Sequence, residues 1–307
     1  MAISFAHTAE GMIVRRPEGM FFVADTDGQL APFARQQLRA EEFFEVCRSA
    51  AEPFNFSDDT LLLPNIFPGI TPVLGAGVTF ANSLRERRLE TLRMGSLDSV
   101  SDDGRATPYD VVYDTNNPPE VFFKATADGH IAPDNEIWIR PDGAPGGGMG
   151  SSVPEPERVL LINRYGEIIA HTVGSDTTAR QLESLSPLYL PAAKTYPGCT
   201  TLCHWFTIYD PGLEVRISME VLRDGVQLYY DEYSSATMKR TPESLVRHAR
   251  TLAPNGLGYF LQGFALFTGT GIIPPVEFSL QAGDKVIIDS PQLGRIDATT
   301  KIVEFNF

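Results

Sequence analysis

A Pro-Glu-Pro-Glu segment that contains Glu155 and Glu157 constrains the fold most, because it leads into two apolar runs on either side of Tyr165-Gly166. Two such runs around a short turn are typical of a β-hairpin. Side chains two residues apart in a strand project to the same side, so Glu155 and Glu157 face one way. If the pairing closes regularly on the turn, Asp176 lies opposite Glu155. The sequence therefore predicts that these carboxylates converge.

Carboxylate oxygens without cysteine or histidine suit a hard cation, and Mg²⁺ fits best, with Mn²⁺ or Ca²⁺ as alternatives. Mg²⁺ usually keeps coordination positions open for water or substrate, which makes such a site catalytic in kind. A Pro-Glu-Pro-Glu segment is also typical of solvated acids in a loop. Both interpretations of Glu155, Glu157 and Asp176 stay open until the rest of the chain is considered.

Composition favours a cytoplasmic enzyme that acts on a small molecule. The net charge of -14, from 39 acids and 25 bases, disfavours binding to nucleic acid or to an anionic membrane. The N-terminus does not resemble a secretion signal, and no apolar stretch approaches the length that spans a bilayer. The 3 cysteines are too few and too odd in number for a disulfide framework.

The chain is predicted to form two domains, a small N-terminal α/β domain at 1–68 and a larger domain at 69–307. Prolines near residue 68 mark the boundary because they interrupt regular structure. The glycine-rich segment 142–150 is expected to be a loop without a phosphate-binding role, since it lacks the lysine-serine pair. We expect helices at 34–51, 80–93 and from Thr241 to before 254, and strands at 12–14, 20–23, 111–113, 121–124, 214–221, 226–230, 283–289 and 302–306. Strands without alternating helices predict an α+β fold on antiparallel or mixed sheets.

Five segments in order resemble the catalytic domain of the fumarylacetoacetate hydrolase superfamily over roughly residues 70–307. They are Pro-Glu-Pro-Glu157, Gly-Ser-Asp-Thr-Thr-Ala-Arg180, Pro-Leu-Tyr-Leu-Pro-Ala-Ala-Lys194, Thr-Gly-Thr-Gly271 and Gly-Asp284. The resemblance implies a β-rich mixed-sheet roll that assembles as a homodimer or homotetramer. It also implies that Mg²⁺ is held by Glu155, Glu157 and Asp176. One departure is Gln181, where the family pattern usually has an acid.

The resemblance further implies a substrate-binding set around the metal. Lys194 and Arg180 are expected beside the cation, and Thr270 is expected to hold the substrate carboxylate. The full predicted set for substrate binding is Ser83, Arg85, Arg180, Thr268, Gly269 and Thr270.

One position separates the reactions of this superfamily. Members that cleave acylpyruvates carry a His-x-x-Glu pair after the first strand of the catalytic domain, whereas this chain has Ser83-Leu-Arg-Glu86. Hydrolysis thereby loses its water-activating base unless His130 or His171 moves in. The surrounding segments resemble the dehydratases of 2-keto-3-deoxy sugar acids. The expected activity is a Mg²⁺-dependent conversion of a 2-keto-3-deoxypentonate to 2,5-dioxopentanoate.

Lys194 and Glu183 are the predicted base and acid, with Lys124 as an alternate. A lysine near a cation has its ammonium form disfavoured, which makes it usable as a base near neutral pH. The alternative for Lys194 is a structural ion pair with a metal-binding carboxylate. Arg85 is expected to bind distal hydroxyls or to lie at the surface. For the whole chain, a hydrolase of C–C bonds in diketo acids and an inactive ligand-binding relative remain alternatives.

Overall fold

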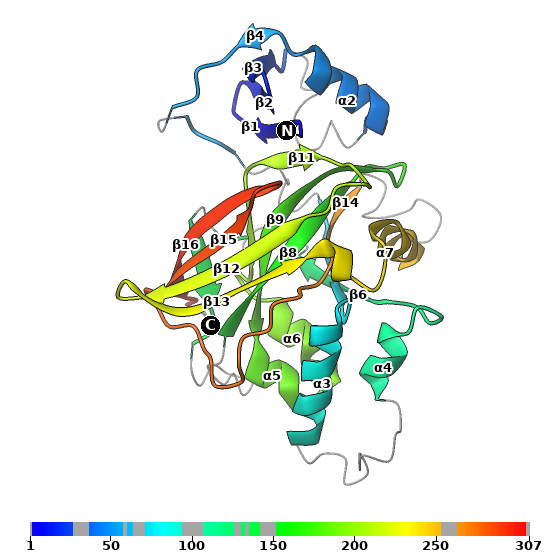
Figure 1. Ribbon diagram of the computed structural model, residues 1–307, viewed down its shortest axis with the longest axis vertical. Coiled ribbons are helices and arrows are strands. Elements are labelled where there is room, and N and C mark those ends of the chain that lie inside the picture. The colour runs from blue at the N-terminus through cyan, green and yellow to red at the C-terminus, as the bar shows by residue number, and fades with distance from the viewer. Residues whose placement is uncertain are drawn as a thin grey trace.

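The computed structural model of this protein describes residues 2–26, 37–57, 60–63, 71–93, 107–125, 130–132, 135–141, 152–252 and 263–304. In these residues the chain forms a sheet of 11 strands and a sheet of 5 strands (Figure 1). Helices are few and lie outside the sheets. The β-rich α+β fold expected from the sequence is confirmed at this level.

The large sheet is mixed. Most neighbouring strands run antiparallel, and β14 pairs in parallel with β5. Its order is β4 (Glu52–Pro53), β3 (Gly19–Ala24), β2 (Gly11–Arg16), β1 (Ser4–His7), β11 (Phe206–Ile208), β9 (Ile168–Ala179), β8 (Ser152–Ile162), β14 (Phe264–Phe267), β5 (Val73–Gly77) and β6 (Glu120–Ala125), with β10 (Thr200–Leu202) also pairing with β9. The predicted strand at 121–124 is β6.

The smaller sheet has the order β13 (Val226–Ser234), β12 (Arg216–Arg223), β15 (Lys285–Ser290), β16 (Gly294–Ile302) and β7 (Glu136–Ile139). Alternate residues of β12, such as Ile217 and Met219, are buried, as their spacing predicts. They pack in one core with Val173 of β9, so this sheet covers one face of the long β8–β9 hairpin. The strand predicted at 302–306 is wrong at 303–304, because β16 ends at Ile302, and residues 305–306 lie outside the described residues.

The N-terminal strands continue the large sheet. The predicted hairpin is β2 and β3, and β1 pairs with β11 with Ser4 opposite Thr207. Helix α2 (Ala40–Ser49) packs Phe43 and Cys47 into the same core as Phe5. The proposed domain boundary near residue 68 and the glycine-rich segment 142–150 lie outside the described residues.

The described helices after α2 are α3 (Ala81–Arg93), α4 (Pro108–Tyr113), α5 (Arg180–Leu185), α6 (Leu190–Lys194) and α7 (Pro242–Ala249), with 3-10 turns at Pro187–Tyr189, Ser235–Thr237 and Arg250–Leu252. Thr241 caps α7 as predicted, since its hydroxyl accepts the N–H of Ser244. None of the described helices is long and apolar enough to cross a bilayer.

Residues 111–113 form the end of α4, so the strand predicted there is wrong. Thr107 and Asp110 form a reciprocal capping box, and Pro108 occupies the first turn of the helix. These helix-start residues outweigh the strand preference of the two valines.

Candidate active site

The β8–β9 hairpin brings the three predicted carboxylates together. Glu155 pairs opposite Asp176, as the regular register predicts, and Glu157 lies opposite Gly174. One ligand oxygen from each of Glu155, Glu157 and Asp176 lies within 4.8 Å of the others, and all three residues are buried. The solvated-loop interpretation of these acids is therefore wrong.

The prolines of β8 fit this place in the sheet. The N–H of Thr177 bonds to the carbonyl of Cys199, the residue before β10, at 2.9 Å, so Pro154, which pairs with Thr177, takes a position that does not bond β9. Pro156, two residues further along β8, is oriented in the same way as Pro154. Its carbonyl accepts a hydrogen bond from the Tyr233 hydroxyl at 3.1 Å. The missing N–H of each proline therefore removes no hydrogen bond between β8 and β9. Glu155 and Glu157, which alternate with the prolines, still project to the same face of the strand.

The pairing of β14 with β8 ends at Val159, close to Glu157. The last contact is the Thr268 N–H on the Arg158 carbonyl at 3.1 Å, after which Gly269 donates its N–H to Glu157 Oε2 at 2.6 Å. Gly269 has φ +88, and a Cβ there would lie 2.1 Å from Thr79 Oγ1. Only glycine combines this backbone conformation with so close an approach.

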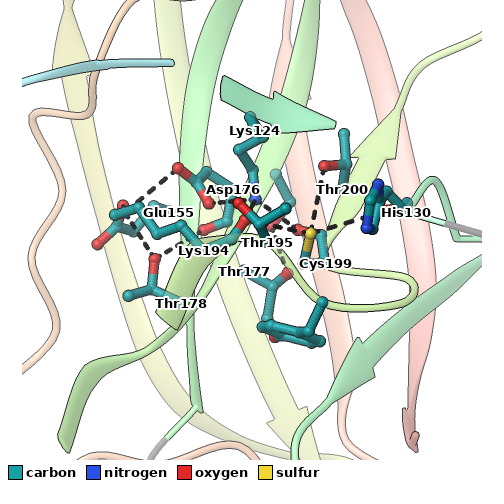
Figure 2. A network of polar contacts seen from close by, with 12 residues as sticks. Lys124, His130, Glu155, Asp176, Thr177, Thr178, Lys194, Thr195, Cys199 and Thr200 are labelled. Carbon is teal, nitrogen blue, oxygen red and sulfur yellow. Dashed lines mark hydrogen bonds and ion pairs between the residues drawn. The ribbon is translucent and has the colours of Figure 1, made fainter. Parts of the chain in front are cut away.

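Two lysines neutralise part of the carboxylate charge (Figure 2). Lys194 Nζ donates to Glu155 Oε2 at 2.6 Å, to Thr178 Oγ1 at 2.7 Å and to Asp176 Oδ2 at 3.2 Å. Lys124 is fully buried on the other side of Asp176, with Nζ 2.6 Å from Oδ1. Lys124 also donates to the carbonyls of Lys194 and Cys199. Asp176 is thus held between both ammonium groups.

Burial and mutual repulsion govern the acids. Burial raises the pKa of Glu155, and burial together with the charges of Asp176 and Glu155 raises the pKa of Glu157 well above its ordinary value. Burial alone would also raise the pKa of Asp176, but Lys124 and Lys194 hold it below its ordinary value. Burial works against the Lys194 ammonium, yet the pKa of Lys194 is raised well above its usual range by Asp176 and Glu155. In the absence of a cation, these surroundings keep the proton on Lys194, and the role of general base stays a prediction.

The carboxylates form the floor of a cavity of about 30 Å³. That volume accommodates an ion or a water. Its walls carry Ser83, Arg87, Glu120, Gly269 and Thr270. Within the part of the chain that the structure describes, no histidine lines this cavity.

The donor set fits a divalent cation. Glu155, Glu157 and Asp176 offer hard oxygens at close range, and two ammonium groups offset only part of their charge. The excess negative charge and the hard oxygen donors both favour a small cation such as Mg²⁺.

Known proteins resemble this chain in fold and in sequence. No family model matches the chain. A solved 2-keto-3-deoxy-D-arabinonate dehydratase complexed with magnesium and 2,5-dioxopentanoate aligns with a TM-score of 0.71 at 21% identity, over 99% of this chain and all of the other. Fumarylacetoacetate hydrolase from Exiguobacterium antarcticum aligns at 0.61 with 16% identity, over 99% of this chain and 100% of that one. These likenesses show the fold.

A probable 2-keto-3-deoxyxylonate dehydratase of Haloferax volcanii is 34% identical over 236 residues, which cover 75% of this chain and 72% of the relative. The chain belongs to the fumarylacetoacetate hydrolase superfamily. The resemblance inferred from the five segments is thereby confirmed. In this superfamily member, the remaining predicted site residues divide into those that reach the cavity and those that do not.

Helix α3 presents Arg87 to the site and not Arg85. Ser83 and Arg87 line the cavity, whereas Arg85 is exposed. Residues two apart on a helix point to different faces, and residues four apart share one. Arg87 also pairs with Glu183 at 2.6 Å, which places Glu183 beside the cavity and 3.9 Å from Lys194.

Of the other predicted substrate-binding residues, Gly269 and Thr270 line the cavity. Arg180 is buried and donates to the Pro275 carbonyl at 2.9 Å, and the Thr268 hydroxyl donates to the Arg158 carbonyl at 2.9 Å. Neither Arg180 nor Thr268 is among the described residues on the cavity wall. Contact of substrate with any of these residues stays a prediction.

Glu120 is a site residue that the sequence interpretation missed. It begins β6, opposite Gly77, and lines the cavity with Arg87. Burial and the charge of Glu183 raise the pKa of Glu120. Its position four residues before Lys124 in one strand was the available indication, because both side chains then share a face.

The two histidines considered for a hydrolase lie away from the carboxylates. His171 is five residues before Asp176 in β9, so their side chains project to opposite faces. Its Nδ1 accepts from the Arg158 guanidinium at 2.7 Å. His130 lies beyond Cys199 as seen from Asp176 (Figure 2).

Proposed function

We propose that this protein is a Mg²⁺-dependent hydro-lyase that converts a 2-keto-3-deoxypentonate to 2,5-dioxopentanoate in sugar-acid catabolism. The observation that carries the proposal is the buried carboxylate triad with Lys194 in a cavity whose described lining has no imidazole. The relatives support it, because one is named as a dehydratase of the xylonate-derived acid and another was solved with magnesium and 2,5-dioxopentanoate.

Glu155, Glu157 and Asp176 are the proposed ligands of the cation, with Mn²⁺ or Ca²⁺ as alternatives to Mg²⁺. A bound divalent cation would polarise the 2-keto group and so acidify the protons on C3. Lys194 fixes the direction of Glu155 and Asp176 through its hydrogen bonds. Lys124 is sealed behind Asp176, which supports a positioning role and not the direct catalytic role predicted.

Dehydration also needs a group that delivers a proton to the departing C4 hydroxyl. Glu120 is the described carboxyl group on the cavity wall outside the triad, and its raised pKa favours the protonated form that can act as an acid. Glu183, which forms an ion pair with Arg87, is the proposed acceptor of the proton that leaves C3. Thr270 and Gly269 are the proposed contacts of the substrate carboxylate.

A five-carbon acid does not fit into about 30 Å³, so substrate entry requires a wall to move. Arg87 is the described wall side chain with the longest reach, and it forms an ion pair with the buried Glu183. We assign Arg87, in place of Arg85, to the distal hydroxyls of the substrate. On substrate binding, the Arg87 guanidinium would give up part of its ion pair with Glu183 and contact the distal hydroxyls of the substrate instead.

The experiment supplies the purified protein with Mg²⁺ and the arabinonate- and xylonate-derived 2-keto-3-deoxy acids. A coupled semialdehyde dehydrogenase should then form 2-oxoglutarate, and an acylpyruvate offered in parallel should stay intact. The variant Glu120→Gln should lower kcat by about a hundredfold, the scale of a lost general acid. Glu220→Gln on β12 serves as its control. Cleavage of the acylpyruvate without dehydration, or binding without turnover of any acid, would contradict the proposal.

We further propose that the enzyme works in the cytoplasm as a homodimer or homotetramer, with an N-terminal unit at 1–68 and a catalytic unit at 69–307. The three cysteines are free and buried, which supports a reducing compartment.

A further inference from the structure

A second cavity, of about 450 Å³, opens where the first strands of the chain meet the turn between β15 and β16. Its walls include Arg15 of β2, Trp205 before β11, and Leu213, Gln292 and Leu293. It shares no described lining residue with the carboxylate cavity. Nothing in the proposed dehydration uses it.

Arg15 is the charged residue of this cavity's described wall, and none of the described acids pairs with it. Its guanidinium carbon stacks 3.8 Å from the centre of the Trp205 ring. Its Nε is buried and has no hydrogen-bond partner, and no described carboxylate lies within ion-pair distance of it. Burial lowers the pKa of Arg15, as expected for a cation partly withdrawn from water.

Arg39 is a second arginine of this protein that stacks on an aromatic ring, and it serves as a comparison for Arg15. It stacks at the same 3.8 Å over Tyr165, but its guanidinium also pairs with Glu167 at 3.1 Å. With 39 acids against 25 bases, the chain has carboxylates in excess. Arg15 lines a cavity without a described carboxylate partner, so its Nη N–H groups are left for an anion, while the buried Nε is out of reach.

We propose that the Arg15 cavity binds a small organic carboxylate at a site separate from the active site. The guanidinium offers the paired N–H groups that match a carboxylate. Trp205, Leu213 and Leu293 offer apolar surface for a carbon body, and Ser4 adds a hydroxyl at the wall. A single cation balances a monoanion, whereas a phosphate dianion would stay half neutralised.

Trp205 gives a direct measurement, because the chain has only 2 tryptophans and the other is Trp138. In a Trp138→Phe protein, titration with benzoate should change the Trp205 fluorescence to saturation. Arg15→Gln should weaken benzoate binding by at least about tenfold, the loss expected for a charged hydrogen-bond pair. Arg164→Gln, an exposed arginine near Tyr165, is the matched control and should leave the binding unchanged.

Three results would overturn the proposal: no saturable change with benzoate, equal benzoate affinity in Arg15→Gln, or tighter binding of inorganic phosphate than of benzoate. If Arg15→Gln fails to fold by circular dichroism, Arg15→Lys takes its place. Lysine keeps the charge but loses the planar fork, so benzoate should bind several-fold more weakly. Unchanged benzoate affinity in the lysine variant would equally contradict the assignment.

Discussion

At the scale of residues, the buried charge of Lys194 determines how the carboxylates of the β8–β9 hairpin are held. Lys194 is bonded to two of the three carboxylates, and its hydrogen bonds leave little freedom for the ammonium. The sequence identified Lys194 as part of the site, but not its protonation state. That state depends on burial and on the distances from Lys194 to Glu155 and Asp176. The spacing of these residues along the chain does not reveal either quantity.

Replacement of Lys194 by glutamine should therefore destabilise the protein by about 3–5 kcal/mol, because it leaves buried carboxylates without their partner. Lys301→Gln is the control, since Lys301 forms a surface pair with Glu136 and should cost no more than about 1 kcal/mol. Urea unfolding of both variants gives the two free energies. Equal losses would show that the buried ion pair adds nothing.

The sequence also missed Arg87 and Glu120 and named Arg85 instead. Helix α3 is charged along much of its length, so its pattern does not fix which side faces the protein. Arg87 and Glu120 meet at the cavity wall only in the folded chain, from segments about 30 residues apart in sequence.

At the scale of elements, local rules predicted the hairpin well. Alternation and a short turn gave the pairing of Glu155 with Asp176, although the register shifts between Leu161 and Ile162, near the turn. The same kind of rule failed for α4, where β-branched residues suggested a strand and the capping box of Thr107 and Asp110 decided for a helix. In α4, the residues that start the helix predict its secondary structure better than the residues inside it.

The turn after β14 is the element that shapes the site, and Gly269→Ala tests it. The added Cβ would lie 2.1 Å from Thr79 Oγ1 and should displace the N–H that bonds Glu157. Gly283→Ala is the matched control, because its φ of +90 is nearly the same while open space surrounds it. The control should cost about 1 kcal/mol from strain alone, and Gly269→Ala should cost at least about 2 kcal/mol more. Thermal unfolding compares the two, and equal losses would contradict the role of close packing at Gly269.

At the scale of the whole molecule, the carboxylate triad projects from the face of the β8–β9 hairpin opposite to Val173, the residue that packs against the smaller sheet. Tyr233 of the smaller sheet bonds the Pro156 carbonyl of the larger one, so both sheets hold the segment between the glutamates. The mixed, β-rich fold followed from strand content and from the superfamily resemblance. The pairings of β1 with β11 and of β14 with β5 did not, because contacts between distant segments leave no local pattern.

The measurement that tests the account most directly is turnover of the 2-keto-3-deoxy acid as a function of Mg²⁺ in protein first treated with a chelator. We predict no dehydration without added cation, saturable recovery with Mg²⁺, and at least about a hundredfold lower kcat in Glu157→Gln, because a lost ligand weakens both the metal site and its geometry. Glu18→Gln, an exposed acid in the N-terminal hairpin turn, should behave as the unaltered protein. Full turnover in the chelated protein, or in Glu157→Gln, would contradict the assignment of the triad as the catalytic cation site.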